Sequence, residues 1–379
     1  MPERKRVLVN AIPMCSVNTG IARYLRCLYM KMELLYANEF EFWYFDGRGI
    51  SQTMPPGPKN LDHWSRLVDL FWKLPVHIAL LIRLGVHVRC EFKFVKLAKG
   101  FDLYHEAGFF PLRTPREVKT IFTIHDLSLL KYPKHHPRER ILYTKLFFQS
   151  RCRRVAHFIS VSEFTKTEMH RYLQVQDDNV TVTPLAHDSS NFFLRQKENA
   201  VSFLHTHNLP EKYFLFVGSG DPRKNMWVIP EALQRSGIDI PLLVVGWSGW
   251  SSKRMPDNVI TAGYVGDEHL ALLYTGALSL VFPSIYEGFG LPVLEAMACG
   301  CPVVTTREAS LQEVGGEAAA YVQDPQDAEE LGLLLTELAS SLEKRRSLGQ
   351  QGLDRAKGFS WERTARLTRD VFWRVLDHA

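Results

Sequence analysis

The sequence predicts an α/β protein of two domains, each built on a doubly wound parallel sheet. Short apolar runs at residues 7–12, 213–217 and 278–282 have the length of buried parallel strands. Each run is followed by a loop rich in small residues and then by a helix start, which is the order of βαβ units. A chain of 379 residues, 46% of them hydrophobic, is long enough to form a core in each of two domains.

The first predicted domain opens with the strand at residues 7–12 and a helix that begins near Gly20. A strand, a loop of small residues and a helix start form an ordinary βα turn, and the same arrangement also suits a phosphate. An aromatic strand follows at residues 40–45. Residues 47–60 are rich in Gly, Pro and Ser and predict a loop.

Residues 63–99 predict one or two helices with both apolar and basic side chains. The apolar stripe consists of Trp64, Leu67, Val68, Phe71 and Trp72, and the surrounding cations are Arg66, Lys73, Arg83, Arg89, Lys93, Lys96 and Lys99. A core-facing helix with a solvated basic side explains this pattern, and the sequence favours that interpretation. The alternative is an amphipathic surface that rests on lipid headgroups.

A histidine directly follows one of the next two predicted strands. After the strand at 102–105, residues 118–124 form another, and it leads directly into His125 and Asp126. Open α/β sheets place their ligand-contacting residues at the carboxyl ends of strands. We therefore expect His125 to contact a ligand.

The remainder of the first domain continues the alternation of helix and strand. Residues 134–154 predict a basic helix with aromatic side chains, and Ser162 is the expected N-cap of the helix after it. Residues 191–207 are polar and predict the linker between domains. The expected domains are residues 1–195, joined by a final helix at about 360–379, and residues 196–359.

The second domain begins with the strand at 213–217 and the loop Gly-Ser-Gly-Asp-Pro-Arg-Lys-Asn. Gly218 and the adjacent cations Arg223 and Lys224 stand where a diphosphate is bound in many α/β proteins. The glycine spacing is not that of a dinucleotide fingerprint. Further strands are expected at 242–245 and 259–260.

The most informative stretch is residues 281–306, which predicts strand, glycine-rich loop, helix and strand. Gly288 and Gly290 let the backbone approach a ligand, and the N–H groups of residues 288–291 at the helix start suit a phosphate. Glu287 and Glu295 frame this loop. Because phosphate repels carboxylates, sugar and ribose hydroxyls are their natural partners.

The segment from Glu287 to Glu295 resembles the E-x7-E signature of retaining, GT-B-fold glycosyltransferases of family 4. The strings T-I-H-D-L, P-R-K-N and Y-E-G-F-G-L-P are most similar to bacterial GDP-mannose-dependent α-mannosyltransferases of lipopolysaccharide O-antigen assembly. The resemblance implies two Rossmann-like domains that face a cleft, with an acceptor-binding N-terminal domain and a C-terminal domain that binds the nucleotide sugar.

The same resemblance assigns roles to individual residues. Glu287 and His125 would contact the transferred sugar, and Glu295 would contact the ribose of the sugar nucleotide. The backbone of Gly288, Phe289, Gly290 and Leu291 would contact the diphosphate, and Gly20 matches the glycine of the first-domain loop. Tyr264 and Val265 would contact the nucleobase. Ser219 replaces the basic residue usual in the family, so the diphosphate contact passes to Gly218, Arg223 and Lys224.

Charge and cysteine content indicate the kind of partner and the cellular compartment. The net charge is +5, with an excess of cations in residues 1–195, which suggests an anionic partner such as a membrane surface or a phospholipid-linked acceptor. No recognition motif for nucleic acid accompanies it. The six cysteines are scattered, as in a reducing cytosol, and no secretory signal is evident. We expect a cytoplasmic protein with peripheral contact at the inner face of the membrane.

These observations predict transfer of a sugar, most simply mannose from GDP-mannose, to a hydroxyl of a lipid-linked glycan with retention of configuration. No D-x-D string is present, and we expect no metal or other cofactor. UDP- and dTDP-sugars remain alternative donors, and a sugar-nucleotide epimerase of similar fold is an alternative enzyme. A glycosidase with Glu287 and Glu295 as acid and base is disfavoured by the phosphate loop between them.

Overall fold

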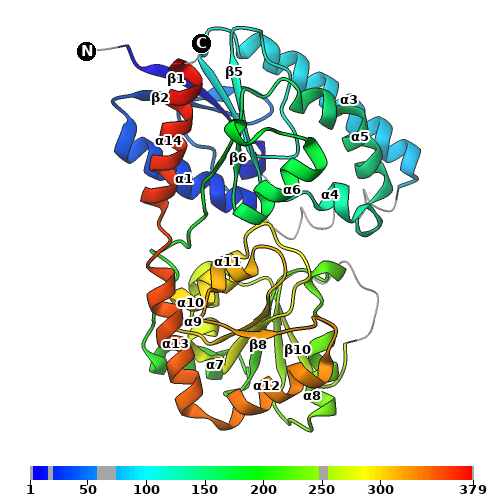
Figure 1. Cartoon of the computed structure of the whole chain (residues 1–379), viewed down its shortest axis with the longest axis vertical. Helices are drawn as coiled ribbons and strands as arrows, with labels where there is room; N and C mark the ends of the chain where they lie inside the picture. The colour runs from blue at the N-terminus through cyan, green and yellow to red at the C-terminus, as the bar shows by residue number, and fades with distance from the viewer. Residues whose placement is uncertain (1–2, 16–19, 58–73, 247–254, 378–379) are drawn as a thin grey trace. The chain divides into compact units, whose positions relative to one another are not determined.

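The computed structural model describes residues 3–15, 20–57, 74–246 and 255–377, and these residues form two compact units. The first unit comprises residues 1–185 and 361–379, and the second comprises residues 186–360. Each unit has its own sheet with helices on both faces (Figure 1). The predicted pair of doubly wound α/β domains is therefore confirmed.

The first sheet has seven strands in the order β3-β2-β1-β4-β5-β6-β7. All neighbours are parallel except β2 and β3. The strands are β1 (Lys5–Asn10), β2 (Phe40–Phe45), β3 (Ile50–Ser51), β4 (Leu103–Glu106), β5 (Lys119–Ile124), β6 (His157–Ser160) and β7 (Val180–Val182). The strand order reverses between β1 and β4, which is where such sheets bind ligands.

Helices cover both faces of the first sheet. They are α1 (Gly20–Tyr36), α3 (Val76–Leu97), α4 (Ser128–Lys131), α5 (Arg138–Cys152), α6 (Glu163–Leu173) and α14 (Trp361–Asp377), with 3-10 turns at η1 (Ile12–Cys15), η2 (Pro133–His135) and η3 (Asp177–Asn179). Because strand side chains alternate, Tyr104 contacts Phe94 of α3, whereas His105 contacts Phe372 of α14. The final helix thus packs in the first unit.

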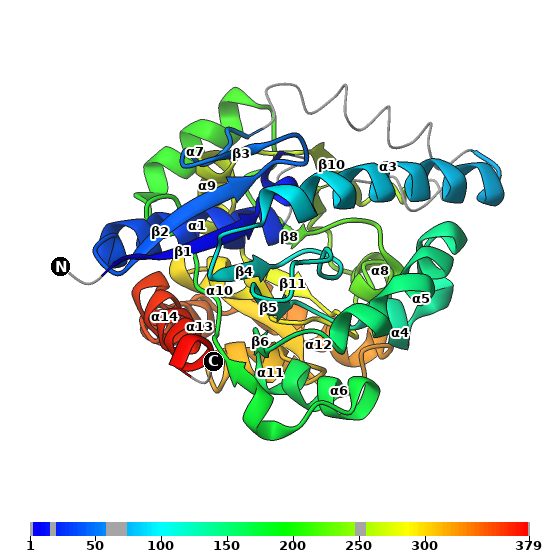
Figure 2. The same cartoon turned by 90° about the horizontal axis from the view of Figure 1, so that it is seen from above.

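Helix α3 differs from the helix favoured by the sequence. It lies beside α5 in both views (Figure 1, Figure 2). Only Ala79, His87 and Phe94 of its residues are buried, and much of its apolar surface is exposed. The solvated side is therefore apolar as well as basic. The predicted apolar stripe at residues 64–72 lies outside the described residues.

The second sheet has six parallel strands in the order β10-β9-β8-β11-β12-β13. They are β8 (Phe214–Val217), β9 (Leu242–Val245), β10 (Val259–Gly263), β11 (Ser279–Phe282), β12 (Val303–Thr306) and β13 (Ala320–Val322). The order reverses between β8 and β11, so their carboxyl ends flank the switch point of this sheet.

The helices of the second unit alternate with these strands. They are α7 (Lys197–Thr206), α8 (Val228–Arg235), α9 (Asp267–Gly276), α10 (Leu291–Ala298), α11 (Leu311–Gly315), α12 (Ala328–Ser340) and α13 (Leu342–Ala356), with a 3-10 turn at η4 (Pro222–Lys224). Helix α10 packs against α13, α7 packs against α9, and α8 packs against α12. The residues from Val293 to Ala298 are all buried, which fixes α10 in place after β11.

Residues 191–207 are not the polar linker that we expected. Residues 197–206 form α7, whose Ala200 and Leu204 are buried against the second unit. Phe192 packs edge-on against Tyr274 of α9. These contacts assign residues 186–195 to the second unit, whereas the sequence placed them in the first.

Candidate active site

The switch point of the second sheet gathers most of the residues that the sequence singled out. The loop after β8 contains Arg223 and Lys224, and the loop after β11 contains Glu287 and leads into α10. A hydrogen bond of 2.9 Å from the Ile285 N–H to the Arg223 carbonyl joins the two loops. Strands β8 and β11 are neighbours, which explains why residues more than sixty positions apart meet here.

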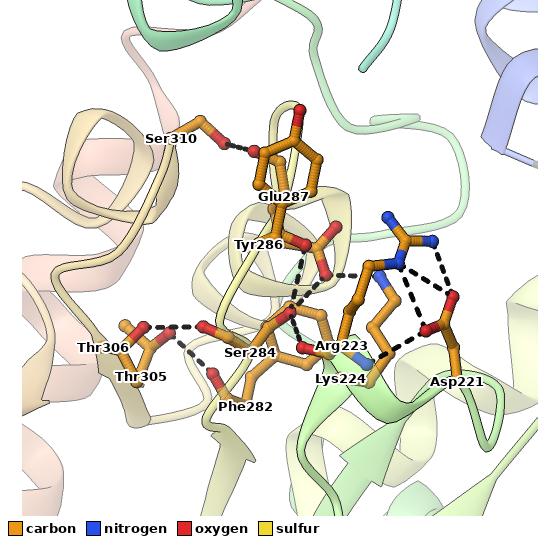
Figure 3. A network of polar contacts seen from close by, with 10 residues as sticks. All are labelled: Asp221, Arg223, Lys224, Phe282, Ser284, Tyr286, Glu287, Thr305, Thr306 and Ser310. Carbon is orange, nitrogen blue, oxygen red and sulfur yellow. Dashed lines mark hydrogen bonds and ion pairs between the residues drawn. The ribbon is translucent and has the colours of Figure 1, made fainter. Parts of the chain in front are cut away.

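A buried serine holds this junction together (Figure 3). The Ser284 hydroxyl is 3.0 Å from the Arg223 carbonyl oxygen and 2.9 Å from Oε1 of Glu287. Its own carbonyl accepts a hydrogen bond of 2.8 Å from Thr306 at the end of β12. Because Ser284 is fully buried, its polar groups need these partners, and they fix the loop in one conformation.

Glu287 forms an ion pair with Lys224 across the junction (Figure 3). Ser310 donates a hydrogen bond of 2.9 Å to the Glu287 carbonyl, so backbone and side chain of this glutamate are both held. The two charges are partly buried, which makes their attraction less screened than on an open surface. The ion pair orients the carboxylate and keeps a cation within reach of the loop.

Arg223 has a different partner. Its Nη2 is 2.6 Å from Oδ2 of Asp221, and its Nε is 3.2 Å from both oxygens of that carboxylate. Burial opposes ionisation of Asp221, but the hydrogen bonds and charge of Arg223 outweigh burial and lower the pKa of Asp221 below its ordinary value. Arg223 is thus engaged in shaping the loop, whereas the sequence suggested a direct role toward a diphosphate.

The start of α10 has the features of an anion site. Gly290 is the N-cap residue and has a positive φ of 101°, a conformation that favours glycine. Within the described part of the chain, the N–H groups of Phe289, Gly290 and Leu291 donate to no protein acceptor. These N–H groups and the helix dipole favour a negatively charged ligand.

Glu295 lies one turn further along α10. Its side chain is 2% exposed, and its Oε2 accepts a hydrogen bond of 3.3 Å from the Tyr274 hydroxyl. A buried carboxylate beside a helix N-terminus is stabilised by the helix dipole. Glu295 therefore lies near the loop, but its carboxylate is less accessible to a ligand than the sequence predicted.

The remaining predicted residues of the second unit lie at other strand ends. Gly218 directly follows β8 and meets Gly246 so closely that a Cβ on Gly246 would be 2.1 Å from the Gly218 carbonyl oxygen. Tyr264, which is 52% exposed, and Val265 follow β10, two strands away from β8. They are not part of the polar network around Ser284. The loop at 247–254, which follows β9, lies outside the described residues.

In the first unit, His125 follows β5 as predicted. The Tyr24 ring, from α1, packs edge-on against it with centroids 4.8 Å apart, and Gly20 begins the same helix. The Nε2 of His125 is buried without a hydrogen-bond partner in the described structure. Burial lowers the pKa of His125 to about 4, although Asp126 and Ala107 oppose this shift. The ring is neutral near pH 7.

A neutral imidazole has one nitrogen that donates a hydrogen bond and one that accepts one. The His125 ring can therefore exchange a hydrogen bond with a hydroxyl. This arrangement suits contact with a sugar or an acceptor alcohol.

Sequence reasoning missed the residues that support the site. Ser284, Asp221 and Thr306 bond mainly to backbone or to a neighbour brought in by folding. A polar residue directly after an apolar strand run was the available signal for Ser284. Among the described residues, no cluster of three or more His, Cys, Asp or Glu side chains has the geometry of a metal site.

Comparison with known proteins places these features in a family. Residues 55–191 match the model for Glycosyltransferase Family 4, and residues 198–355 match the model for Glycosyl transferases group 1. An O-antigen chain mannosyltransferase B of Escherichia coli is 31% identical over 374 residues, which cover 93% of this chain and 96% of that protein.

Two further relatives extend the comparison. An O-antigen chain mannosyltransferase of Salmonella typhimurium is 27% identical over 215 residues, which cover 54% of this chain and 56% of that protein. The solved structure of a sucrose-phosphate synthase from Thermosynechococcus elongatus covers 100% of both chains with a TM-score of 0.70 and 20% identity. The last similarity shows the fold. With these matches and the loop at the switch point, the chain belongs to the GT-B glycosyltransferases of family 4, and it is a glycosyltransferase of polysaccharide synthesis.

Proposed function

We propose that this enzyme transfers mannose from GDP-mannose to a hydroxyl of a lipid-linked glycan, with retention of configuration and without a metal. The observation that carries the proposal is the start of α10, where three N–H groups without a protein acceptor lie in the same loop as Glu287. Mannose as the sugar is supported by the relatives named as O-antigen chain mannosyltransferases.

The chemistry follows from where charge develops. When the bond between the sugar and the diphosphate breaks, the leaving nucleoside diphosphate gains negative charge. The N–H groups of residues 289–291 would stabilise that charge, and Lys224 would move from Glu287 toward a phosphate oxygen. Glu287, released from its ion pair, would accept hydrogen bonds from the sugar. Glu295 would accept a hydrogen bond from the ribose.

His125 would contribute from the first unit. Its neutral imidazole can exchange a hydrogen bond with a hydroxyl of the sugar. Because its pKa is about 4, the ring is neutral and keeps an acceptor nitrogen throughout the neutral pH range. Gly20 and the nucleobase contacts of Tyr264 and Val265 remain parts of the proposal that rest on the family resemblance.

The test of this function is a panel of sugar nucleotides with GDP-, UDP- and dTDP-linked sugars. We expect release of GDP from GDP-mannose that depends on an added glycan acceptor, and a product with the α configuration. An altered sugar that is formed without an acceptor and is still attached to its nucleotide would identify an epimerase. Turnover only with UDP- or dTDP-sugars would reject GDP-mannose as the donor.

A lipid-linked acceptor requires access to a membrane surface, and we propose that α3 provides it. The α3 face is the exposed side of this helix, with the apolar residues Ile78, Leu81, Ile82, Val86, Val88 and Phe92 and the cations Arg89, Lys93 and Lys96. Leu81 is 67% and Phe92 is 65% exposed. Glu91, the one carboxylate in α3, points elsewhere and pairs with Arg151 at 2.7 Å.

This combination fits an anionic lipid surface. Apolar side chains can enter the boundary between headgroups and acyl chains, while exposed cations bind anionic headgroups. No helix in the described parts of the chain is long and apolar enough to cross a bilayer. The proposed contact is therefore peripheral and lies along the surface of the membrane.

Vesicle sedimentation tests the contact. We expect the protein to bind vesicles with anionic phospholipid, to bind neutral vesicles less, and to lose binding when Leu81 and Phe92 are both replaced by serine. Leu333→Ser on α12 is the matched control, because Leu333 is 68% exposed and lies in the other unit. Equal sedimentation of the double variant and the wild type would reject the α3 face as the membrane contact.

A further inference from the structure

A buried tyrosine packs against His125. The side chain of Tyr24, on α1, is 0% exposed, and its ring meets the His125 ring edge-on with an interplanar angle of 79°. Trp361 of α14 also lies against the Tyr24 ring, with centroids 6.1 Å apart. The proposed function gives Tyr24 no role. Because it has no exposed surface, Tyr24 does not touch a substrate, and any effect on transfer must pass through a neighbour.

The Tyr24 hydroxyl is anchored to the strand that leads into His125. It forms a hydrogen bond of 3.1 Å with Oγ1 of Thr123, which lies on β5 two positions before the histidine. Tyr24 thus bonds one residue at the end of this strand and packs against another. Because the ring is fixed at its hydroxyl by the bond and along its side by packing, it has little freedom to move.

Thr123 has a second partner that fixes the position of its hydroxyl. Its Oγ1 is 2.8 Å from Nε2 of His105 on β4, and Nδ1 of His105 is 2.6 Å from the Tyr29 hydroxyl oxygen. Burial lowers the pKa of His105 to about 3, so this ring is neutral and offers one donor and one acceptor nitrogen to the two hydroxyls. A buried polar network whose members all have partners is rigid. The anchor of Tyr24 is therefore itself held in place.

The His125 side chain is less enclosed than these residues. It is half-buried and lies just past the end of β5, and its Nε2 has no hydrogen-bond partner among the residues that the structure describes. Rotation about χ1 and χ2 would direct the ring nitrogens to different places. A large and fixed ring against one side of the imidazole removes part of this freedom, so that the nitrogens keep one direction.

We propose that Tyr24 is a positioning residue for sugar transfer: its ring, anchored through Thr123, holds the imidazole of His125 in the orientation that meets the sugar. The inference rests on the role proposed above for His125. The contacts run from His105 to Thr123 and Tyr24 through hydrogen bonds, and from Tyr24 to His125 through ring packing.

Tyr24 acts through His125 and not as a reacting group. Burial raises the pKa of the Tyr24 hydroxyl above its ordinary value, although the hydrogen bond with Thr123 opposes the shift. The hydroxyl therefore stays protonated near pH 7 and serves only as a hydrogen-bonding group. Its effect on transfer is geometric, because a displacement of about 1 Å at a reacting group can lower the rate about a hundredfold.

The experiment compares the wild type with Tyr24→Leu and Tyr24→Phe in the full-length enzyme, each alone and combined with His125→Ala. Leucine removes the ring, whereas phenylalanine keeps the ring and loses only the hydroxyl. NMR relaxation of isotope-labelled histidine gives the order parameter of the His125 ring, and steady-state kinetics with GDP-mannose and acceptor give kcat and KM. Tyr44→Leu is the matched control, because Tyr44 is also buried in the first unit and bonds a carboxylate, but its ring packs against Tyr29.

We expect the order parameter of the His125 ring to fall in Tyr24→Leu and to be retained in Tyr44→Leu. In Tyr24→Leu, kcat should fall roughly ten- to hundredfold with little change in KM for the donor. Tyr24→Phe should show a smaller fall in both the order parameter and kcat, because its ring remains but has lost its anchor. In the His125→Ala background the loss of kcat should disappear, since no imidazole is left to orient.

An equally ordered His125 ring in folded Tyr24→Leu would overturn the inference, and so would a loss of kcat that is as large in the His125→Ala background. If Tyr24→Leu does not fold, Tyr24→Phe decides, and an unchanged order parameter and kcat in that variant would overturn the inference. Absence of wild-type turnover with GDP-mannose would reject the proposed donor, while the order parameter, which needs no substrate, would still decide whether Tyr24 holds the ring. Wild-type turnover in His125→Ala would reject the role of His125 in transfer and, with it, a positioning role for Tyr24.

Discussion

Lys224 and Glu287 were both predicted as site residues, but their ion pair was not. They are 63 positions apart, and the sequence gives no measure of which strands are neighbours in a sheet. The family resemblance assigned Lys224 to the phosphate and Glu287 to the sugar. Folding brings them together because β8 and β11 are adjacent. The ion pair holds the cation of Lys224 beside the proposed diphosphate site.

Replacement of Lys224 by methionine tests this cation. Methionine keeps the length and apolar stem but removes the charge, so the leaving diphosphate loses a partner and Glu287 loses its ion pair. We expect kcat/KM for GDP-mannose to fall by about a hundredfold or more. Measurement of GDP release gives the value.

Lys357→Met is the matched control, because Lys357 also pairs with a carboxylate in the second unit, at 2.7 Å from Asp354, and is 75% exposed. It should retain wild-type turnover. If Lys224→Met and Lys357→Met gave the same kcat/KM, Lys224 would have no part in transfer.

Arg223 shows a second limit of sequence reasoning at this scale. Two adjacent cations after a glycine loop gave no indication that one of them, Arg223, forms an ion pair with Asp221. The deciding quantity is burial, since a carboxylate that is 5% exposed requires a partner and Arg223 is the nearest. Sequence patterns identify charges, whereas folding determines which of them are already neutralised.

At the scale of elements, the start of α10 was predicted closely. Glycines before Leu291 and Pro292 indicated the helix start, and the structure begins α10 at Leu291 with Gly290 as its N-cap. Local sequence suffices here because capping depends on residues within one turn. Helix α7 was missed because polar residues precede and follow its short apolar stretch, and only packing against α9 reveals its buried side.

Gly290→Ala tests the anion site. Alanine at φ 101° is strained by about 1–3 kcal/mol. Relief of that strain would turn the N–H groups of residues 289–291 away from the ligand. The side-chain clash is a minor factor, since the new Cβ would meet only the flexible end of Leu311 at 2.8 Å. We expect lower thermal stability and weaker binding of GDP by isothermal titration calorimetry.

Gly266→Ala is the control for this substitution. Gly266 is also a helix N-cap, at the start of α9, but its φ is −65° and nothing lies within 4 Å of the added Cβ. It should bind GDP as the wild type does. Unchanged GDP affinity in Gly290→Ala would show that the start of α10 does not hold the diphosphate.

At the scale of the molecule, the two units and the return of the final helix to the first unit agree with what the order of strands and helices predicts. The division into two units follows from strand periodicity and chain length, and both can be read directly from the sequence. The ten residues 186–195 were misassigned because their membership depends on contacts such as Phe192 with Tyr274. The exposed apolar side of α3 corresponds to the alternative interpretation of residues 63–99 and not to the favoured one, since periodicity does not show which side is covered.

Buried neutral histidines make the first unit sensitive to acid. Burial lowers the pKa of His105 to about 3 and that of His125 and His157 to about 4, and the charge of Arg374 adds to the shift in His157. The unfolded chain binds these protons near the ordinary histidine pKa of 6.5. Their contribution to stability is therefore complete above that value and is lost as pH falls toward 4.

We expect the melting temperature of the first unit to fall between about pH 6.5 and about pH 4. His157→Gln should lessen the dependence on pH in this range, because one group no longer titrates. Differential scanning calorimetry of both proteins across the range measures the slopes. Identical slopes would contradict the assignment of His157 as a buried neutral group.

The most direct test of the donor site is the equilibrium binding of GDP to the wild type and to Glu295→Ala. Glu295 lies on α10, just past the N–H groups that would hold the diphosphate, and its proposed partner is the ribose. Loss of one hydrogen bond to a charged group should weaken binding by about ten- to a hundredfold. GDP bound equally well by Glu295→Ala, or not bound by the wild type, would contradict a nucleotide site at the switch point of the second sheet.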